Sequence, residues 1–133
     1  MLVALATVST SWAQNKQSQV TELVQLLSKQ PDGMDVIEWK EKRRDAARKL
    51  GDLGDTRAVP TLIKVVEKEE FDVVGEFAIE ALGKLGDDRA VEVLRRVAAN
   101  PARDRDQRKA ARKALKRLGT SATGGGGSGG GKT

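Results

Sequence analysis

The sequence contains no cysteine and no histidine. Without cysteine the chain has no disulfide bonds, no thiolate metal sites and no cysteine nucleophile. Without histidine it lacks the commonest general base and the usual ligand of transition metals. The absence of histidine also excludes the serine–histidine–aspartate arrangement. We therefore expect no enzyme and predict no catalytic, cofactor-binding or metal-binding residues.

Aromatic residues are also scarce, at 3% of the 133 residues, and tyrosine is absent. The core must therefore be built from leucine, valine, isoleucine and alanine, which suits closely packed helices. A chain of this length buries roughly 60–68% of its unfolded surface, enough for one modest domain. We expect that domain over residues 14–119, between two ends that do not look globular.

The N-terminal residues 1–13 resemble the end of a secretory signal peptide. Residues 2–8 form an apolar run, and Ser11 and Ala13 place small residues before a cleavage site. The run is too short to span a bilayer, which takes about 20 apolar residues. This pattern predicts a secreted or periplasmic protein. The positively charged start of a signal peptide is missing, so a simple apolar leader on a cytoplasmic protein is the alternative.

Residues 120–133 are almost entirely glycine, serine, threonine and alanine, a composition that predicts a disordered tail or linker. The tail contains a formal phosphate-loop match, in which Gly126 is followed by Gly131, Lys132 and Thr133. A working phosphate loop needs a strand before it and a helix after it. Neither is present in this glycine tract, so we do not assign a nucleotide site.

The central part of the chain repeats itself. Residues 50–59 read Leu-Gly-Asp-Leu-Gly-Asp-Thr-Arg-Ala-Val and return 32 positions later as Leu-Gly-Lys-Leu-Gly-Asp-Asp-Arg-Ala-Val. A fainter copy, Leu-Lys-Arg-Leu-Gly, follows 33 residues further on, at 115–119. A period of this length marks stacked units that cannot bury their apolar faces alone. A simple helical bundle, the alternative, needs no such self-similarity.

Apolar residues at helical spacing predict six helices, over residues 17–29, 36–53, 58–68, 72–85, 88–99 and 104–118. The repeated segment then has a local meaning. Its second leucine ends a helix, and Gly54 or Gly86 takes the left-handed conformation. Asp55 in the first copy, and Asp87 or Asp88 in the second, then caps the next helix. Trp39, near the start of the second helix, is interpreted as a cap over the N-terminal repeat.

Three helices share the spacing Ala-x3-Leu-x2-Leu, starting at Ala46, Ala78 and Ala111. Together with the Leu-Gly-x-Leu-Gly-Asp-x-Arg-Ala-Val segment, this pattern resembles HEAT-like repeats of the short type known from phycobilisome lyases. Gly75 departs from the pattern, where an arginine is expected, and we expect it to remove one contact between repeats. The resemblance implies an all-α, right-handed α-solenoid of about three helix pairs.

Aligning the repeats places charged residues in rows on the second helix of each pair. One row holds Arg44, Glu76 and Lys109, the next holds Arg48, Glu80 and Lys113, and a third holds Gly51, Gly83 and Lys116. In HEAT-like stacks the second helices line the concave face, so we interpret these rows as its exposed surface. The alternating charges predict ion pairs between neighbouring helices. The alternative is a groove whose cations are free for an acidic partner.

The last helix is strongly basic. Residues 101–118 contain 8 basic and 2 acidic residues, whereas residues 55–100 contain 7 basic and 10 acidic ones. A terminal helix needs a polar outer face, which accounts for part of this charge. Nucleic-acid binding is the alternative, but no aromatic residue interleaves the charges to stack on bases.

The function predicted from these patterns is a non-enzymatic scaffold that binds another protein, with an acidic partner as one option. The resemblance leaves a lyase-like or chaperone subunit of an enzyme as a further alternative. The candidate partner-binding residues are Arg44, Arg48, Glu76, Glu80, Lys109, Arg112, Lys113 and Lys116.

Overall fold

The computed structural model describes residues 3–119, with side chains from residue 13 onward. The described part is helical. Its elements, in chain order, are α1 (Val3–Ser28), α2 (Val36–Leu53), the short 3₁₀ helix η1 (Thr56–Ala58), α3 (Val59–Lys68), α4 (Val73–Leu85), the 3₁₀ helix η2 (Asp88–Ala90), α5 (Val91–Ala99) and α6 (Arg105–Arg117). The Gly-rich tail predicted at 120–133 lies outside the described residues.

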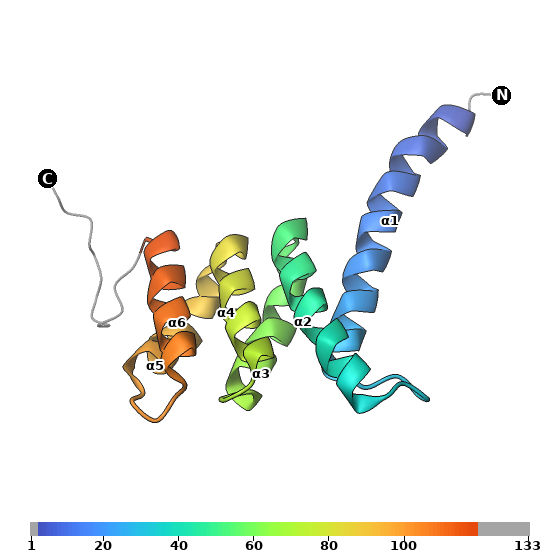
Figure 1. Cartoon of the computed structure of the whole chain (residues 1–133). Helices are drawn as coiled ribbons and strands as arrows, with labels where there is room; N and C mark the ends of the chain where they lie inside the picture. The colour runs from blue at the N-terminus through green and yellow to red at the C-terminus, as the bar shows by residue number, and fades with distance from the viewer. Residues whose placement is uncertain (1–2, 120–133) are drawn as a thin grey trace, which may run out of the picture.

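The helices form two layers (Figure 1). We call α1, α3 and α5 the A layer, and α2, α4 and α6 the B layer. Each A helix packs against the B helix that follows it, and the three B helices lie side by side in the order α2, α4, α6. This arrangement confirms the predicted α-solenoid of three helix pairs. The B helices contact one another far more extensively than α3 contacts α5, so the B layer is the inner, concave side.

The turns between layers use the predicted chemistry. Gly54 and Gly86 have φ angles of 71° and 68° and end α2 and α4 in the left-handed conformation. The Asp55 and Asp87 carboxylates then accept hydrogen bonds from the backbone amides two residues on and so begin η1 and η2. The repeated Leu-Gly-Asp segment is thus a stop-and-restart signal between an inner helix and the next outer one.

The core runs along the interface between the two layers. Its largest completely buried side chains include Leu27, Leu50, Leu62, Leu82, Leu94 and Leu115. The central helix α4 is buried on several sides, because it contacts α2, α3 and α6 at once. Ile79 in this helix is completely buried.

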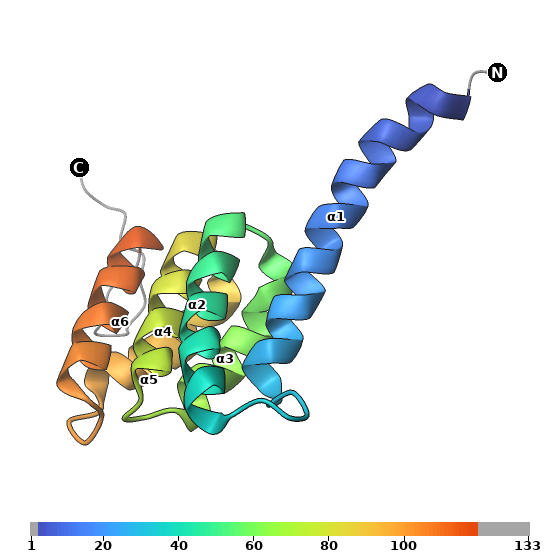
Figure 2. The same cartoon turned by 45° about the vertical axis from the view of Figure 1, so that its right-hand side comes forward.

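Helix α1 begins at Val3 and not near Gln17, so the predicted first helix was too short. No glycine or proline occurs before Pro31, and nothing in the sequence breaks the helix earlier. Its N-terminal turns project away from the other helices, as Figure 2 shows. The signal peptide over residues 1–13 remains a prediction. A search of the described residues finds no helix with the length and apolar character needed to cross a membrane.

Candidate protein-binding surface

The B layer is held together by a close approach of helices at two glycines. A Cβ atom placed on Gly51 of α2 would lie 2.9 Å from the Cα atom of Ala81 in α4. One repeat later, a Cβ on Gly83 of α4 would lie 2.9 Å from the Cβ atom of Ala114 in α6. Such distances are shorter than real side chains allow. The two glycines therefore set how closely the three B helices approach one another.

These glycines correct one sequence prediction. The row of Gly51, Gly83 and Lys116 was interpreted as exposed, but Gly51 and Gly83 are buried at the helix contacts. Lys116 alone is exposed, because the solenoid has no further B helix on that side among the described residues. Only the first two rows therefore qualify as binding-surface residues along all three helices.

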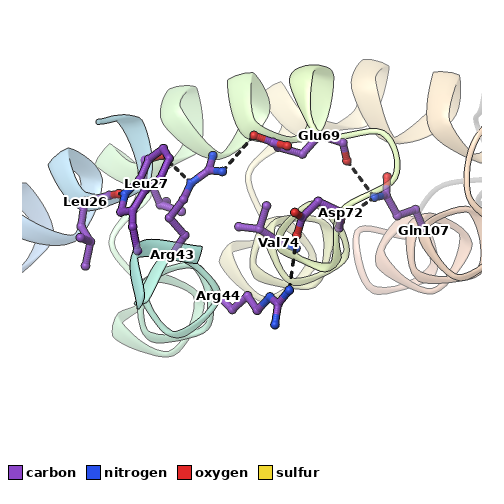
Figure 3. Close-up of polar contacts among 9 residues, drawn as sticks. Leu26, Leu27, Arg43, Arg44, Glu69, Asp72, Val74 and Gln107 are labelled. Atoms are coloured by element: carbon purple, nitrogen blue, oxygen red, sulfur yellow. Dashed lines mark hydrogen bonds and ion pairs between the residues drawn. The ribbon is translucent and has the colours of Figure 1, made fainter. Parts of the chain in front are cut away.

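A polar network joins the layers at the turn between α3 and α4 (Figure 3). Buried Arg43 of α2 donates from Nε to the Leu27 carbonyl at 3.0 Å and from Nη1 to Glu69 Oε1 at 2.9 Å. Gln107 of α6 donates from Nε2 to the carbonyls of Glu69 and Asp72, at 2.8 and 2.9 Å. The α3–α4 turn is thus hydrogen-bonded to both neighbouring B helices, α2 and α6.

The end of α1 is capped by the start of α2. The Trp39 Nε1–H group donates to the Leu26 carbonyl at 2.8 Å, and the Arg43 guanidinium stacks on the Trp39 ring at 4.7 Å. Two carbonyls in the last turn of α1, which would otherwise lack partners, are therefore satisfied by side chains of α2. The interpretation of Trp39 as a cap over the first repeat is confirmed.

The space left by Gly75 is used by Gln107. A Cβ atom on Gly75 would lie 2.4 Å from the Glu69 carbonyl and 2.6 Å from Gln107 Nε2. The missing side chain leaves room for Gln107 to reach across to the turn. Gly75 therefore permits a contact between repeats that the sequence pattern did not predict, while the loss of an arginine contact at this position stays a prediction.

The predicted ladder of ion pairs is wrong in its partners. Arg44 lies 3.9 Å from Asp72, and Arg48 pairs with Asp45 on its own helix at 3.0 Å while its guanidinium covers the Phe77 ring at 5.2 Å. Among the residues with described side chains, no ion pair joins Glu76 or Glu80 to the basic residues of their rows. The ion pair that does connect two B helices is Asp52–Lys84, at 2.8 Å.

The carboxylates of α4 lie in a locally acidic region. Partial burial raises the pKa of Glu76, and the nearby charges of Glu80, Asp106 and Asp104 raise it further. On α4 the carboxylates Glu76 and Glu80 precede Lys84, and Asp106 lies in the first turn of α6, where a carboxylate suits the helix dipole. The basic residues of α6 are spread along its whole length.

The cations of α6 differ from those of α2. Arg112 donates weakly to the Ala98 carbonyl at 3.4 Å. Lys109, Lys113 and Lys116 are exposed and make no ion pair with any residue in the described part of the chain. The structure thus brings the predicted α6 residues together on one surface and leaves their charges open to solvent.

Sequence reasoning missed two buried polar residues, Arg103 and Gln107. Arg103, between α5 and α6, donates from Nε to Gln107 Oε1 at 2.8 Å and also binds the Val66 carbonyl. Burial lowers the pKa of Arg103, while Glu70, at 3.8 Å, opposes that shift. No spacing signal distinguished these two residues from the other polar residues around them. Within residues 13–119 no group of acidic side chains is arranged to hold a metal ion.

The family model described as HEAT repeats matches residues 20–116, most of the chain. The chain belongs to the HEAT-repeat family. A comparison with curated proteins found no match. The HEAT-repeat match covers all three helix pairs, from the middle of α1 to the end of α6. HEAT repeats generally mediate protein–protein interaction, and the family is typically non-catalytic.

Proposed function

We propose that this HEAT-repeat chain is a non-enzymatic scaffold that binds another protein on the surface of the B layer. One observation carries the proposal: three arginines of α2 are paired with carboxylates of the chain, whereas two exposed lysines of α6 are not. Arg43, Arg44 and Arg48 each face a carboxylate, but Lys109 and Lys113 have none among the residues described. A surface with uncompensated positive charge favours a partner of opposite sign.

Nucleic-acid binding through α6 is less favoured by the same surface. Bases are gripped by exposed aromatic rings, and α6 contains none. The rings of Trp39 and Phe77, on the other B helices, are already covered by arginine side chains. The acidic residues Glu76, Glu80 and Asp106 lie on the neighbouring surface and repel phosphates. A protein surface with mixed charges fits this pattern better.

The scaffold would act outside the cytoplasm if the predicted signal peptide is cut after Ala13. Mass spectrometry of the N-terminus of the natural protein tests this part separately. A mature chain that starts at Gln14 supports export, and one that keeps residues 1–13 contradicts it.

Photo-crosslinking from both layers tests the scaffold proposal. A photoreactive amino acid is placed at Arg48, Glu80 or Lys113 in the B layer, and at Lys64 or Glu92 in the A layer as matched exposed controls. We expect protein adducts from the B positions and far fewer from the A positions. Adducts that form equally from both layers, or that contain nucleic acid, would contradict the proposal.

A further inference from the structure

A shallow groove lies between α4 and α6. It is lined by six residues, two from α4 and four from α6: Glu80, Lys84, Ala110, Lys113, Ala114 and Arg117. Each of these residues has a counterpart one repeat earlier, at the seam between α2 and α4. Those counterparts are Arg48, Asp52, Phe77, Glu80, Ala81 and Lys84. The molecule therefore contains two versions of the same site, and they can be compared directly.

The α2–α4 seam is filled and neutralised by the chain itself. The Phe77 ring occupies it, covered by the Arg48 guanidinium. The Asp52 carboxylate and the Lys84 ammonium close it with an ion pair at 2.8 Å. An apolar ring and a carboxylate beside a cation are thus what this site accepts when it is occupied.

The α4–α6 groove lacks both of these fillers. Ala110 stands where Phe77 stands one repeat earlier, so the ring is missing and the groove is open. Lys84 stands at the position of Asp52, and Arg117 at the position of Lys84. Two cations therefore line the seam in place of the attractive pair. The Lys84 ammonium is already paired with Asp52, so the Arg117 charge is the one left without a carboxylate among the described residues.

The backbone places the two cations equivalently. The Lys84 stem packs over Gly51, with Cδ 3.3 Å from a Cβ position on that glycine. The Arg117 stem packs over Gly83 in the same way, at 3.6 Å. Both stems are thus held on a glycine of the preceding helix, and Lys84 and Arg117 both line the groove. Lys113 adds a further charge at the position of Glu80 in the first seam.

We propose that the α4–α6 groove binds an acidic segment of a partner protein that carries a large apolar side chain. The apolar side chain takes the place of Phe77 above Ala110 and Ala114. A carboxylate of the partner pairs with Arg117 and Lys113, the two groove cations that have no ion pair among the described residues. This inference rests on the proposed scaffold function and names the chemistry of its partner.

Selection from a library of random short peptides displayed on phage tests the proposal. The full chain is the bait, and the selected peptides are then titrated against a Lys113→Glu/Arg117→Glu variant and a Lys64→Glu control. Lys64 is an exposed residue of α3, on the other layer. The selected peptides should combine acidic residues with an aromatic or large aliphatic one. The groove variant should weaken their binding about tenfold or more, since each reversal replaces attraction by repulsion.

Other results would overturn the proposal. The proposal is overturned if no acidic sequence is enriched, or if the groove variant and Lys64→Glu bind the peptides equally well. It is also overturned if duplex DNA binds the groove more tightly than the peptides, or if the groove is occupied by a second copy of the chain. Sedimentation of wild type and groove variant reveals the last case. If B-layer crosslinks to a protein persist while the peptide test fails, the scaffold stands and only the groove assignment falls.

Discussion

Gly83 of α4 lies directly against Ala114 of α6, and a Cβ atom on the glycine would come within 3.0 Å of the alanine Cα. The same relationship joins Gly51 and Ala81 one repeat earlier. The spacing of the B layer therefore depends on two positions where the chain has no side chain at all.

Gly83→Ala is expected to destabilise the protein. Replacing glycine by alanine within a helix normally stabilises it by about 1 kcal/mol. Here the new methyl group meets the backbone of α6, and overpacking of this kind costs about 1–3 kcal/mol. We expect a net loss in the free energy of unfolding, measured by chemical denaturation.

The double variant Gly83→Ala/Ala114→Gly provides the control. Removing the methyl group of Ala114 makes room for the new one, so the two changes should not add. The second substitution would then cost less in the Gly83→Ala background than alone. Strict additivity would show that the two residues do not limit the approach of α4 and α6.

Leu82→Ala should reduce the free energy of unfolding by about 2–5 kcal/mol, as expected for truncation of a buried leucine. Leu82 is completely buried in α4, at 0% exposure. Ile37→Ala, at a side chain that is 67% exposed, is the matched control and should change stability by less than about 0.5 kcal/mol. If the two variants lose similar amounts, Leu82 does not have the core role assigned to it.

Gly75→Arg restores the arginine expected from the repeat pattern, and it should nevertheless destabilise the protein. The new side chain would displace Gln107 from the Glu69 and Asp72 carbonyls. Lost hydrogen bonds to buried groups and steric overlap together should cost more than about 2 kcal/mol. Thermal or chemical unfolding measures this effect, with Gln107→Ala for comparison. An increase in the free energy of unfolding would mean that an arginine fits at position 75, as the repeat pattern predicts.

Acid should weaken the turn at Asp55. Hydrogen bonds from the Arg57 side chain and backbone lower the pKa of Asp55 from 3.8 to about 2. Between these two pKa values the Asp55 carboxylate is protonated in the unfolded chain but not in the folded chain. The free energy of unfolding therefore falls as the pH is lowered through this range. The Asp87–Arg89 pair shifts the pKa of Asp87 in the same direction. Carboxylates titrate between about pH 5 and pH 2. Over this range the free energy of unfolding should depend less on pH in the Asp55→Asn/Asp87→Asn variant than in the wild type. If the free energy of unfolding depends on pH equally in the variant and the wild type, the Asp55–Arg57 and Asp87–Arg89 pairs are not the cause of the pH dependence.

The architecture could be predicted from the sequence because its signals are local. The Leu-Gly-Asp segment fixes a helix end, a left-handed residue and a cap within a few positions, and all three were confirmed at Gly54 and Asp55. Helix boundaries from residue 36 onward follow the predicted ranges closely for the same reason. The start of α1 was missed because no local signal marks it.

Contacts between repeats were harder to predict, because a repeat alignment shows which residues are equivalent and not which ones touch. Arg44 was aligned with Glu76 but lies beside Asp72, four positions earlier. The hydrogen-bonded pair of Arg103 and Gln107 depends on the space left by Gly75. That space exists only once the helices are packed. The difference between the two seams likewise became visible only when Phe77 and Asp52 were seen to fill the first.

The most direct test of the account is to fill the open groove without changing any charge. Ala110→Phe places a ring where Phe77 lies one repeat earlier, so the variant should fold with a cooperative unfolding transition like that of the wild type. Isothermal titration calorimetry with an acidic, aromatic peptide selected on the wild-type chain then measures the affinity of both proteins. The account predicts that Ala110→Phe binds the peptide about tenfold more weakly or worse. A folded Ala110→Phe variant that binds the peptide as tightly as the wild type would contradict it.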